Sequence, residues 1–169
     1  MRCVGDPRRE ELEVSLLRVL FVCTHSGARS RIAEEFAKRA APKHVEPYSA
    51  SLESDRIGPL PIFVMNEVGL ELPTAPPKSI FQRYDDHEQF DYVVALCDPA
   101  SSEQAPVFMA SVDALYDETA QRANWVIPNF RSLTGTEEER KAGARQIRDP
   151  IQTEVATFLA QLGLDADRI

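Results

Sequence analysis

The sequence has few cysteines, few glycines and no long apolar run. Its 169 residues contain 3 cysteines and 7 glycines. An odd, small number of cysteines does not build the disulfide framework of a secreted domain, so we expect reduced thiols and a cytoplasmic protein. No apolar stretch is long enough to span a bilayer, and the charged start of the chain lacks the apolar core of a signal peptide.

Basic residues are also scarce. Lysine and arginine number 19 against 27 aspartates and glutamates, which gives a formal net charge of −8. With no basic block in the chain, nucleic acid and anionic membranes are not expected as partners. Any anion-binding site must then be a local positive region of an acidic protein. His, Cys and carboxylate residues do not occur at the spacing of a metal site, so no metal is expected.

The length and the apolar content of 43% predict one globular domain with a sizeable core. We place this domain at residues 18–169 and treat residues 1–17 as an N-terminal extension. The extension contains Cys3, which we interpret as an incidental cysteine. We find no internal repeat and no second domain.

Residues 18–37 are the most informative part of the chain, RVLFVCTHSGARSRIAEEFA. A run of strand-forming residues leads to Cys23, and a helix with apolar residues three and four apart begins after a short polar segment. A tight turn from a strand into a helix leaves several backbone N–H groups unpaired, and the helix dipole adds to their attraction for an anion. We therefore expect the segment after Cys23 to bind an oxyanion and Cys23 to be a thiolate nucleophile.

Two further residues fit this chemistry. Arg29 can form a planar, two-pronged contact with a tetrahedral oxyanion, and the Ser30 hydroxyl can hydrogen-bond to the thiolate. A buried structural role for Cys23 is the alternative, because the residue ends an apolar strand. The strand before it, the helix after it and the Arg29–Ser30 pair favour the nucleophile. The candidate substrate-binding residues are Thr24, His25, Ser26, Gly27, Ala28 and Arg29.

A family resemblance rests on these residues. Residues 20–33 resemble the signature loop of the low-molecular-weight protein tyrosine phosphatases, a superfamily that also contains thiol-dependent arsenate reductases. Later segments resemble the reductase branch, and with the loop they span about residues 18–160. They are residues 48–50, residues 65–69, residues 91–97, Trp125 and residues 135–139.

The resemblance and the apolar patterns predict a single-domain α/β fold of three layers, in which about four parallel strands are flanked by helices on both faces. After the first strand and helix, we expect strands at residues 44–51, 90–97 and 124–127. Helices are expected at residues 59–69, 79–89 and 136–162, with Pro150 bending or breaking the last. Residues 100–123 are hard to interpret and suggest only a helical turn and a loop. His44 and His87 are expected at the surface.

The resemblance also implies a chemistry. Arsenate would bind in the loop, Cys23 would attack arsenic, and a second thiol would then attack the Cys23 sulfur and release arsenite. Cys97 resembles the resolving cysteine of the reductases, and it would lie near Cys23 because parallel strands end at one side of a sheet. A buried structural cysteine is the alternative for Cys97. The scheme needs no bound cofactor, only an external thiol reductant such as thioredoxin, glutaredoxin or a low-molecular-weight thiol.

Three positions depart from the family pattern. Thioredoxin-coupled members carry a further cysteine where this chain has Gln104, so Cys3 or an external thiol would have to take that part. Asn129 and Phe130 stand where the family has an aspartate and a proline, and asparagine cannot act as the general acid of phosphotyrosine hydrolysis. Ser26 replaces the usual asparagine of the loop, with His25 beside it. The candidate carboxylates to replace the acid are Asp98, Asp113 and Asp117.

Three functions remain open from the sequence. Arsenate reduction is favoured, because sulfur chemistry with a water-like leaving group tolerates the loss of the acid better than ester hydrolysis. The first alternative is a phosphatase that hydrolyses phosphate monoesters through a cysteinyl-phosphate. The second is an oxyanion-binding protein that has lost turnover, although such a protein would not need to retain Cys23.

Overall fold

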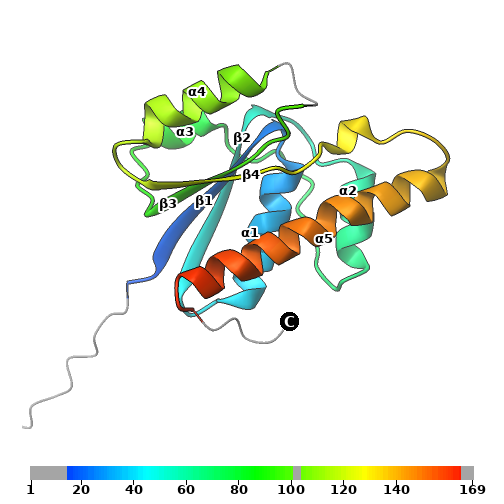
Figure 1. The fold of residues 1–169 in the computed structure, drawn as a ribbon, viewed down its shortest axis with the longest axis horizontal. Coiled ribbons are helices and arrows are strands. Elements are labelled where there is room, and N and C mark those ends of the chain that lie inside the picture. Colours follow the sequence, from blue (N-terminus) through cyan, green and yellow to red (C-terminus); the bar gives the residue numbers. More distant parts are fainter. Residues whose placement is uncertain (1–14, 101–103, 165–169) are drawn as a thin grey trace, which may run out of the picture.

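One sheet of four parallel strands forms the centre of the molecule (Figure 1). The computed structural model describes residues 15–100 and 104–164. The strand order is β2-β1-β3-β4, and the strands are β1 (Leu17–Ser26), β2 (Val45–Ser54), β3 (Tyr92–Leu96) and β4 (Gln121–Trp125). The predicted single-domain α/β fold is confirmed.

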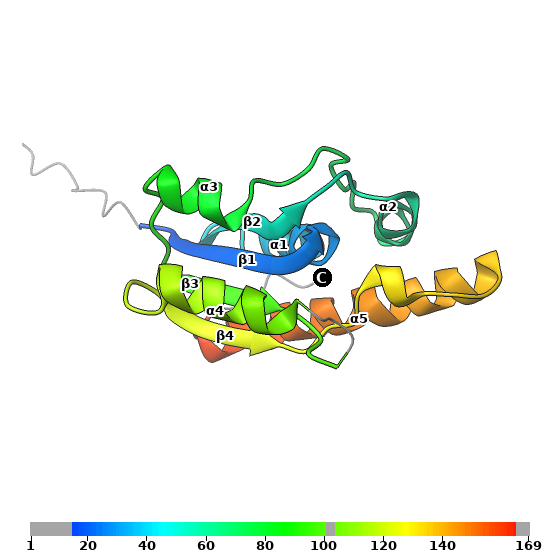
Figure 2. The same ribbon diagram turned by 90° about the horizontal axis from the view of Figure 1, so that it is seen from above.

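Helices cover both faces of this sheet, which gives the three layers that the sequence predicted (Figure 1), and Figure 2 shows the same arrangement from above, with the strands side by side. On one face lie α1 (Ala28–Ala40) and the long α5 (Glu137–Gln161), and α2 (Pro59–Asn66) packs beside α5. On the other face lie α3 (Ile80–Asp85) and α4 (Ala105–Tyr116). None of the helices in the described part of the chain is long and apolar enough to cross a membrane.

The first strand is central because both of its faces are apolar. Residues 19–23 have no solvent exposure at all. Phe21 and Cys23 pack into the core beneath α1 and α5, whereas Leu20 and Val22 pack into the core beneath α3 and α4. This alternation places successive side chains of one strand in two separate cores.

The order of the strands brings two strand ends together at one point. The chain passes from β1 to β2 on one side and then crosses to β3 on the other side of β1, so the direction of strand addition reverses beside β1. Open α/β sheets bind ligands outside the carboxyl ends of the strands at such a reversal. Cys23 pairs with Leu96 in the β1–β3 register, and Cys97 follows directly.

Two predicted elements differ from the structure. The last strand begins at Gln121 and ends at Trp125, instead of covering residues 124–127, because its pairing with β3 starts opposite Tyr92. The segment that the sequence left as a turn and a loop contains α4, which has three turns. Its apolar residues are spread around the helix without a clear amphipathic stripe, which is why the pattern did not reveal it.

Of the bend or break predicted at Pro150, the break is wrong, because α5 continues through this residue. The helix begins with a capping box, in which Thr136 and Glu139 bind each other's backbone N–H groups. Ile147, Ile151 and Val155 of this helix are buried against the sheet. We infer that this burial compensates for the hydrogen bond that the proline cannot donate.

Part of the expected organisation falls outside the described residues. This applies to Cys3 and to most of the proposed N-terminal extension, so the boundary at residue 18 stays a prediction. The predicted surface positions of His44 and His87 are confirmed, since both side chains are exposed.

Candidate active site

The turn between β1 and α1 has left-handed backbone at two successive residues. The φ angles are 55° at Ser26 and 96° at Gly27, and α1 begins at Ala28. A Cβ atom on Gly27 would lie 2.2 Å from Cγ of Pro77. Glycine is therefore required here both by the backbone conformation and by the close approach of Pro77.

The N-terminus of α1 has no side chain that would compete with an anion. The N-cap is Gly27, no side chain caps the helix, and its first turn contains no acidic residue. The N–H groups of a first helical turn have no partner within the helix. We infer that these groups, together with the helix dipole, make residues 24–29 an anion-binding site, the oxyanion loop.

Cys23 lies at the base of this loop beside Ser30. The Cys23 thiol donates to Ser30 Oγ at 3.3 Å, and the Ser30 hydroxyl donates to the Gly27 carbonyl at 3.0 Å. Both residues are completely buried. Because a hydroxyl can rotate, Ser30 is placed to donate to a Cys23 thiolate, the role that we predict for it.

Arg29 is fixed in the same region by two hydrogen bonds. Its side chain is only 2% exposed. Nη1 donates to the Ile127 carbonyl at 2.9 Å, and Nη2 donates to Thr24 Oγ1 at 2.8 Å. A guanidinium has five N–H donors, so others remain for an oxyanion. The contact with Ile127, from the segment after β4, could not be foreseen from the sequence.

Cys97 lies close to Arg29 and Cys23. Its backbone N–H donates to the Trp125 carbonyl at 3.1 Å, which continues the pairing of β3 with β4. Burial raises the pKa of the Cys97 thiol, and the charge of Arg29 opposes that rise. Neither Cys23 nor Cys97 forms a disulfide.

A hydrogen-bonded group that the sequence did not reveal links the loop to two other elements. His25 Nδ1 lies 3.0 Å from Glu53 Oε2, at the end of β2. Gln104 Nε2, at the start of α4, donates to Glu53 Oε1 at 3.0 Å. Hydrogen bonds from Gln104 and His25 lower the pKa of Glu53. Nothing in the sequence marks Glu53, because its role depends on the pairing of β1 with β2.

Asn129 lies in the segment after β4 as the N-cap of a short helix, η1 (Phe130–Ser132). Its Oδ1 accepts a hydrogen bond from the Arg131 N–H at 3.1 Å. The side chain thus has a structural role in this turn, and no carboxyl group stands at the position.

The three carboxylates considered as replacement acids lie in different places. Asp98 is next to Cys97, and its Oδ1 accepts from the Ala100 N–H at 3.0 Å. Asp113 pairs with Arg122 at 3.3 Å in the second half of α4, and Asp117 follows the end of that helix. Since α4 starts near the carboxyl ends of the strands, only Asp98 is near the oxyanion loop.

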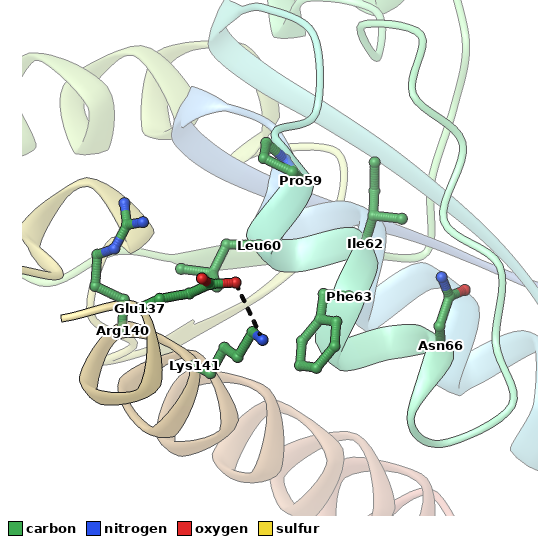
Figure 3. A pocket seen from close by; sticks show the side chains of 8 residues that line it. All are labelled: Pro59, Leu60, Ile62, Phe63, Asn66, Glu137, Arg140 and Lys141. Atoms are coloured by element: carbon green, nitrogen blue, oxygen red, sulfur yellow. Dashed lines mark ion pairs between the residues drawn. The ribbon is translucent and has the colours of Figure 1, made fainter.

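A separate groove lies between α2 and α5 (Figure 3). Its volume is about 490 Å³, and its lining combines apolar residues of α2 with charged residues of α5. Lys141 lies over the Phe63 ring at 4.5 Å and pairs with Glu137 at 3.2 Å. No residue of the oxyanion loop lines this groove, so it is distinct from the Cys23 site.

Metal ligands do not gather in residues 15–100 and 104–164: no three His, Cys, Asp or Glu side chains lie close enough together to hold an ion.

Comparisons with known proteins agree with this architecture. Residues 18–168 match the family model described as low molecular weight phosphotyrosine protein phosphatase. An arsenate reductase of Shouchella clausii is 30% identical over 140 residues, which cover 83% of this chain and 93% of that protein. A glutaredoxin arsenate reductase of a Synechocystis species is 37% identical over 82 residues, 47% of this chain and 60% of that protein.

A solved structure supports the fold independently. The arsenate reductase of Archaeoglobus fulgidus superposes with a TM-score of 0.61, and the match covers 84% of this chain and 98% of that one. Its sequence identity is 22%, so the likeness concerns the arrangement of the sheet and helices.

Proposed function

This chain belongs to the low molecular weight phosphotyrosine protein phosphatase family, and we propose that it reduces arsenate to arsenite. The observation that carries the proposal is the gathering of two thiols around one buried arginine. Cys23 lies at the base of the oxyanion loop, and Cys97 follows the neighbouring strand. The positive charge of Arg29 acts to lower the pKa of the Cys97 thiol. A phosphatase needs the first thiol but has no use for the second.

The first step is the binding of arsenate by the oxyanion loop. The N–H groups at the start of α1 and the remaining donors of Arg29 hold the anion, and the Ser30 hydroxyl turns toward the Cys23 thiolate. Because the protein as a whole is acidic, these local positive groups provide the attraction.

The chemical steps conserve atoms and electrons. The Cys23 thiolate attacks arsenic, a sulfur–arsenic bond forms, and one arsenic–oxygen bond breaks as that oxygen leaves with protons as water. The Cys97 thiolate then attacks the Cys23 sulfur. A disulfide forms, the sulfur–arsenic bond breaks, and its electron pair remains on arsenic, which leaves as arsenite.

An external thiol reductant restores the two thiols. We propose a small partner of the glutaredoxin or thioredoxin type, or a low-molecular-weight thiol, and a cytoplasmic site of action. The relative in Synechocystis is a glutaredoxin arsenate reductase, which supports the first of these. Gln104 stands where a third cysteine would relay the disulfide to the surface, which favours direct attack by the partner on the Cys23–Cys97 pair.

A direct test combines arsenate with each class of reductant. Purified protein is mixed with arsenate and, in turn, with thioredoxin, glutaredoxin or a small thiol, each with its reductase, and arsenite is measured. Cys23→Ser is the control. Arsenite release that depends on Cys23 supports the proposal. Rapid hydrolysis of a phenyl phosphate ester without arsenite release would favour the phosphatase, and anion binding without either reaction would favour a silent binder.

A further inference from the structure

The proposed reaction needs a proton at the oxygen that leaves arsenic, and the usual donor of the family is absent. Asn129 has no proton to give for this purpose, and its Oδ1 accepts a hydrogen bond from the backbone of the same turn. Hydroxide is a poor leaving group unless it is protonated as it departs. Another group near Cys23 should therefore supply that proton.

His25 has the right placement for this task. His25 belongs to the oxyanion loop itself, two residues after Cys23, and its backbone carbonyl lies 3.9 Å from Cys23 Sγ. The imidazole is 15% exposed, so it is accessible from the solvent.

Glu53 gives the imidazole a fixed orientation. One carboxylate oxygen lies 3.0 Å from Nδ1 of His25, and the other accepts from Gln104 Nε2 at 3.0 Å. Because both oxygens are engaged, the carboxylate cannot turn away. A carboxylate that binds Nδ1 leaves Nε2 as the ring nitrogen available to a bound oxyanion.

We propose that His25, oriented by Glu53, is the general acid that protonates the oxygen leaving arsenic. This inference rests on the proposed function. When the Cys23 thiolate forms the sulfur–arsenic bond, the arsenic–oxygen bond breaks and the proton of the imidazolium passes to that oxygen, so that water leaves and a neutral imidazole remains. Solvent then returns the proton to His25. Glu53 touches neither substrate nor sulfur and is a positioning residue.

In the described part of the chain, the charged or titratable groups near the pair include three from different elements. Cys23 lies on the same strand, and its Sγ is 3.9 Å from the His25 carbonyl. Asp55 follows β2, and its backbone N–H binds the Ser26 carbonyl. The positive charge of Arg131, in η1, contributes to the lowered pKa of Glu53. The simpler role for His25, shaping the turn, would make its effect independent of pH.

The test is a pH series of single-turnover arsenate reduction with wild-type protein and His25→Gln. Glutamine keeps a hydrogen-bond donor for Glu53 but cannot transfer a proton. At acid pH we expect His25→Gln to be at least about 100-fold slower, and we expect the ratio of the two rates to fall toward one as the wild-type imidazolium loses its proton. The substrate's own ionisation is common to both proteins, so it cancels in this ratio.

Two further variants separate catalysis from structure. Glu53→Gln should give a smaller loss, because glutamine still offers the imidazole a hydrogen-bond partner but lacks the charge of the carboxylate. His44→Gln makes the same substitution at an exposed histidine outside the site and should leave the profile unchanged. A rate ratio that is close to one, or that does not vary with pH, overturns the proposal.

A second reaction distinguishes failure of this inference from failure of the reductase function. Loss of ¹⁸O from labelled inorganic phosphate requires Cys23 to expel water from phosphorus, without any redox step. If wild-type protein exchanges ¹⁸O with the predicted His25 dependence but yields no arsenite, the general acid stands and the reductase does not. If it catalyses neither reaction, both proposals are overturned.

Discussion

The side chains of Cys23 and Cys97 lie on opposite faces of the sheet, although the two residues are neighbours at the ends of adjacent strands. Cys23 packs into the core beneath α1 and α5, and Cys97 packs into the core beneath α3 and α4. In the register of β1 with β3, the residue opposite Cys23 is Leu96, which shares its face. Cys97 comes one residue later and therefore points the other way.

This relationship has a consequence for the proposed disulfide. Two cysteines whose Cβ atoms point apart cannot be joined without movement of the backbone. The hydrogen bond from the Cys97 N–H to Trp125 must therefore break, or the strand end must rotate, before Cys97 can reach the Cys23 sulfur. We expect the resolving step to be coupled to a local rearrangement at the end of β3.

Replacing Cys97 separates the two activities of the site. Cys97→Ser should stop arsenate reduction when no small thiol is added and should leave any hydrolysis of phenyl phosphate within a few-fold of wild type, because only the redox step uses Cys97. Arsenite release and ester hydrolysis are measured on the same preparations. Equal loss of both activities would show that Cys97 serves only the packing of the core.

The rate of disulfide formation should depend on pH through Cys97. Only the thiolate is a nucleophile, and burial raises the pKa of this thiol above its ordinary value. Below that pKa the thiolate fraction grows about tenfold per pH unit, so the resolving step should accelerate by this factor across neutral and mildly alkaline pH. Acid quenching and alkylation after single turnovers measure the step, and a rate that is flat with pH would contradict the assignment.

Arg29 should not be replaceable by lysine. A lysine provides one point charge. It cannot hydrogen-bond to the Ile127 carbonyl and to Thr24 Oγ1 while it also makes a planar, two-pronged contact with an oxyanion. We expect Arg29→Lys to lower kcat/KM for arsenate by about 10- to 100-fold, as expected for the loss of a charge-assisted hydrogen bond. Arg31→Lys is the matched control on the same helix. Comparable losses in both variants would argue for a general effect of charge or folding.

Gly27 should be essential to the fold of the loop. Gly27→Ala would force a Cβ atom against Pro77 and a left-handed conformation on alanine, which should cost about 2 kcal/mol or more of unfolding free energy. Gly58 provides a matched control, because its φ is −71° and a Cβ there would meet nothing within 4 Å. Urea unfolding of both variants measures the difference, and equal stabilities would contradict the close approach of Pro77.

Much of this architecture could be predicted from local sequence patterns. The apolar run before Cys23 and the amphipathic residues of α1 revealed the central strand–loop–helix unit, because burial on both faces and a 3.6-residue period leave clear patterns. The apolar run of β3 was recognised in the same way, although the strand ends at Leu96, one residue before the predicted end at Cys97. These features depend only on residues that are close in the sequence.

What the sequence could not predict depends on contacts between distant segments. Glu53 is an ordinary acidic residue at the end of a strand until pairing brings it to His25. The Ile127 carbonyl accepts a hydrogen bond from Arg29, although the two residues are 98 positions apart in the sequence. Pro150 was expected to disrupt α5, but the packing of that helix on the sheet outweighs a local preference.

The most direct test of the central claim is the state of the thiols after arsenate has been added to fully reduced protein. Intact mass under non-reducing conditions, titration of thiols and peptide mapping follow the reaction, with Cys23→Ser as the control. The account predicts arsenite release together with a disulfide between Cys23 and Cys97. Unchanged thiols, with no arsenite in the presence of any thiol reductant, would contradict it.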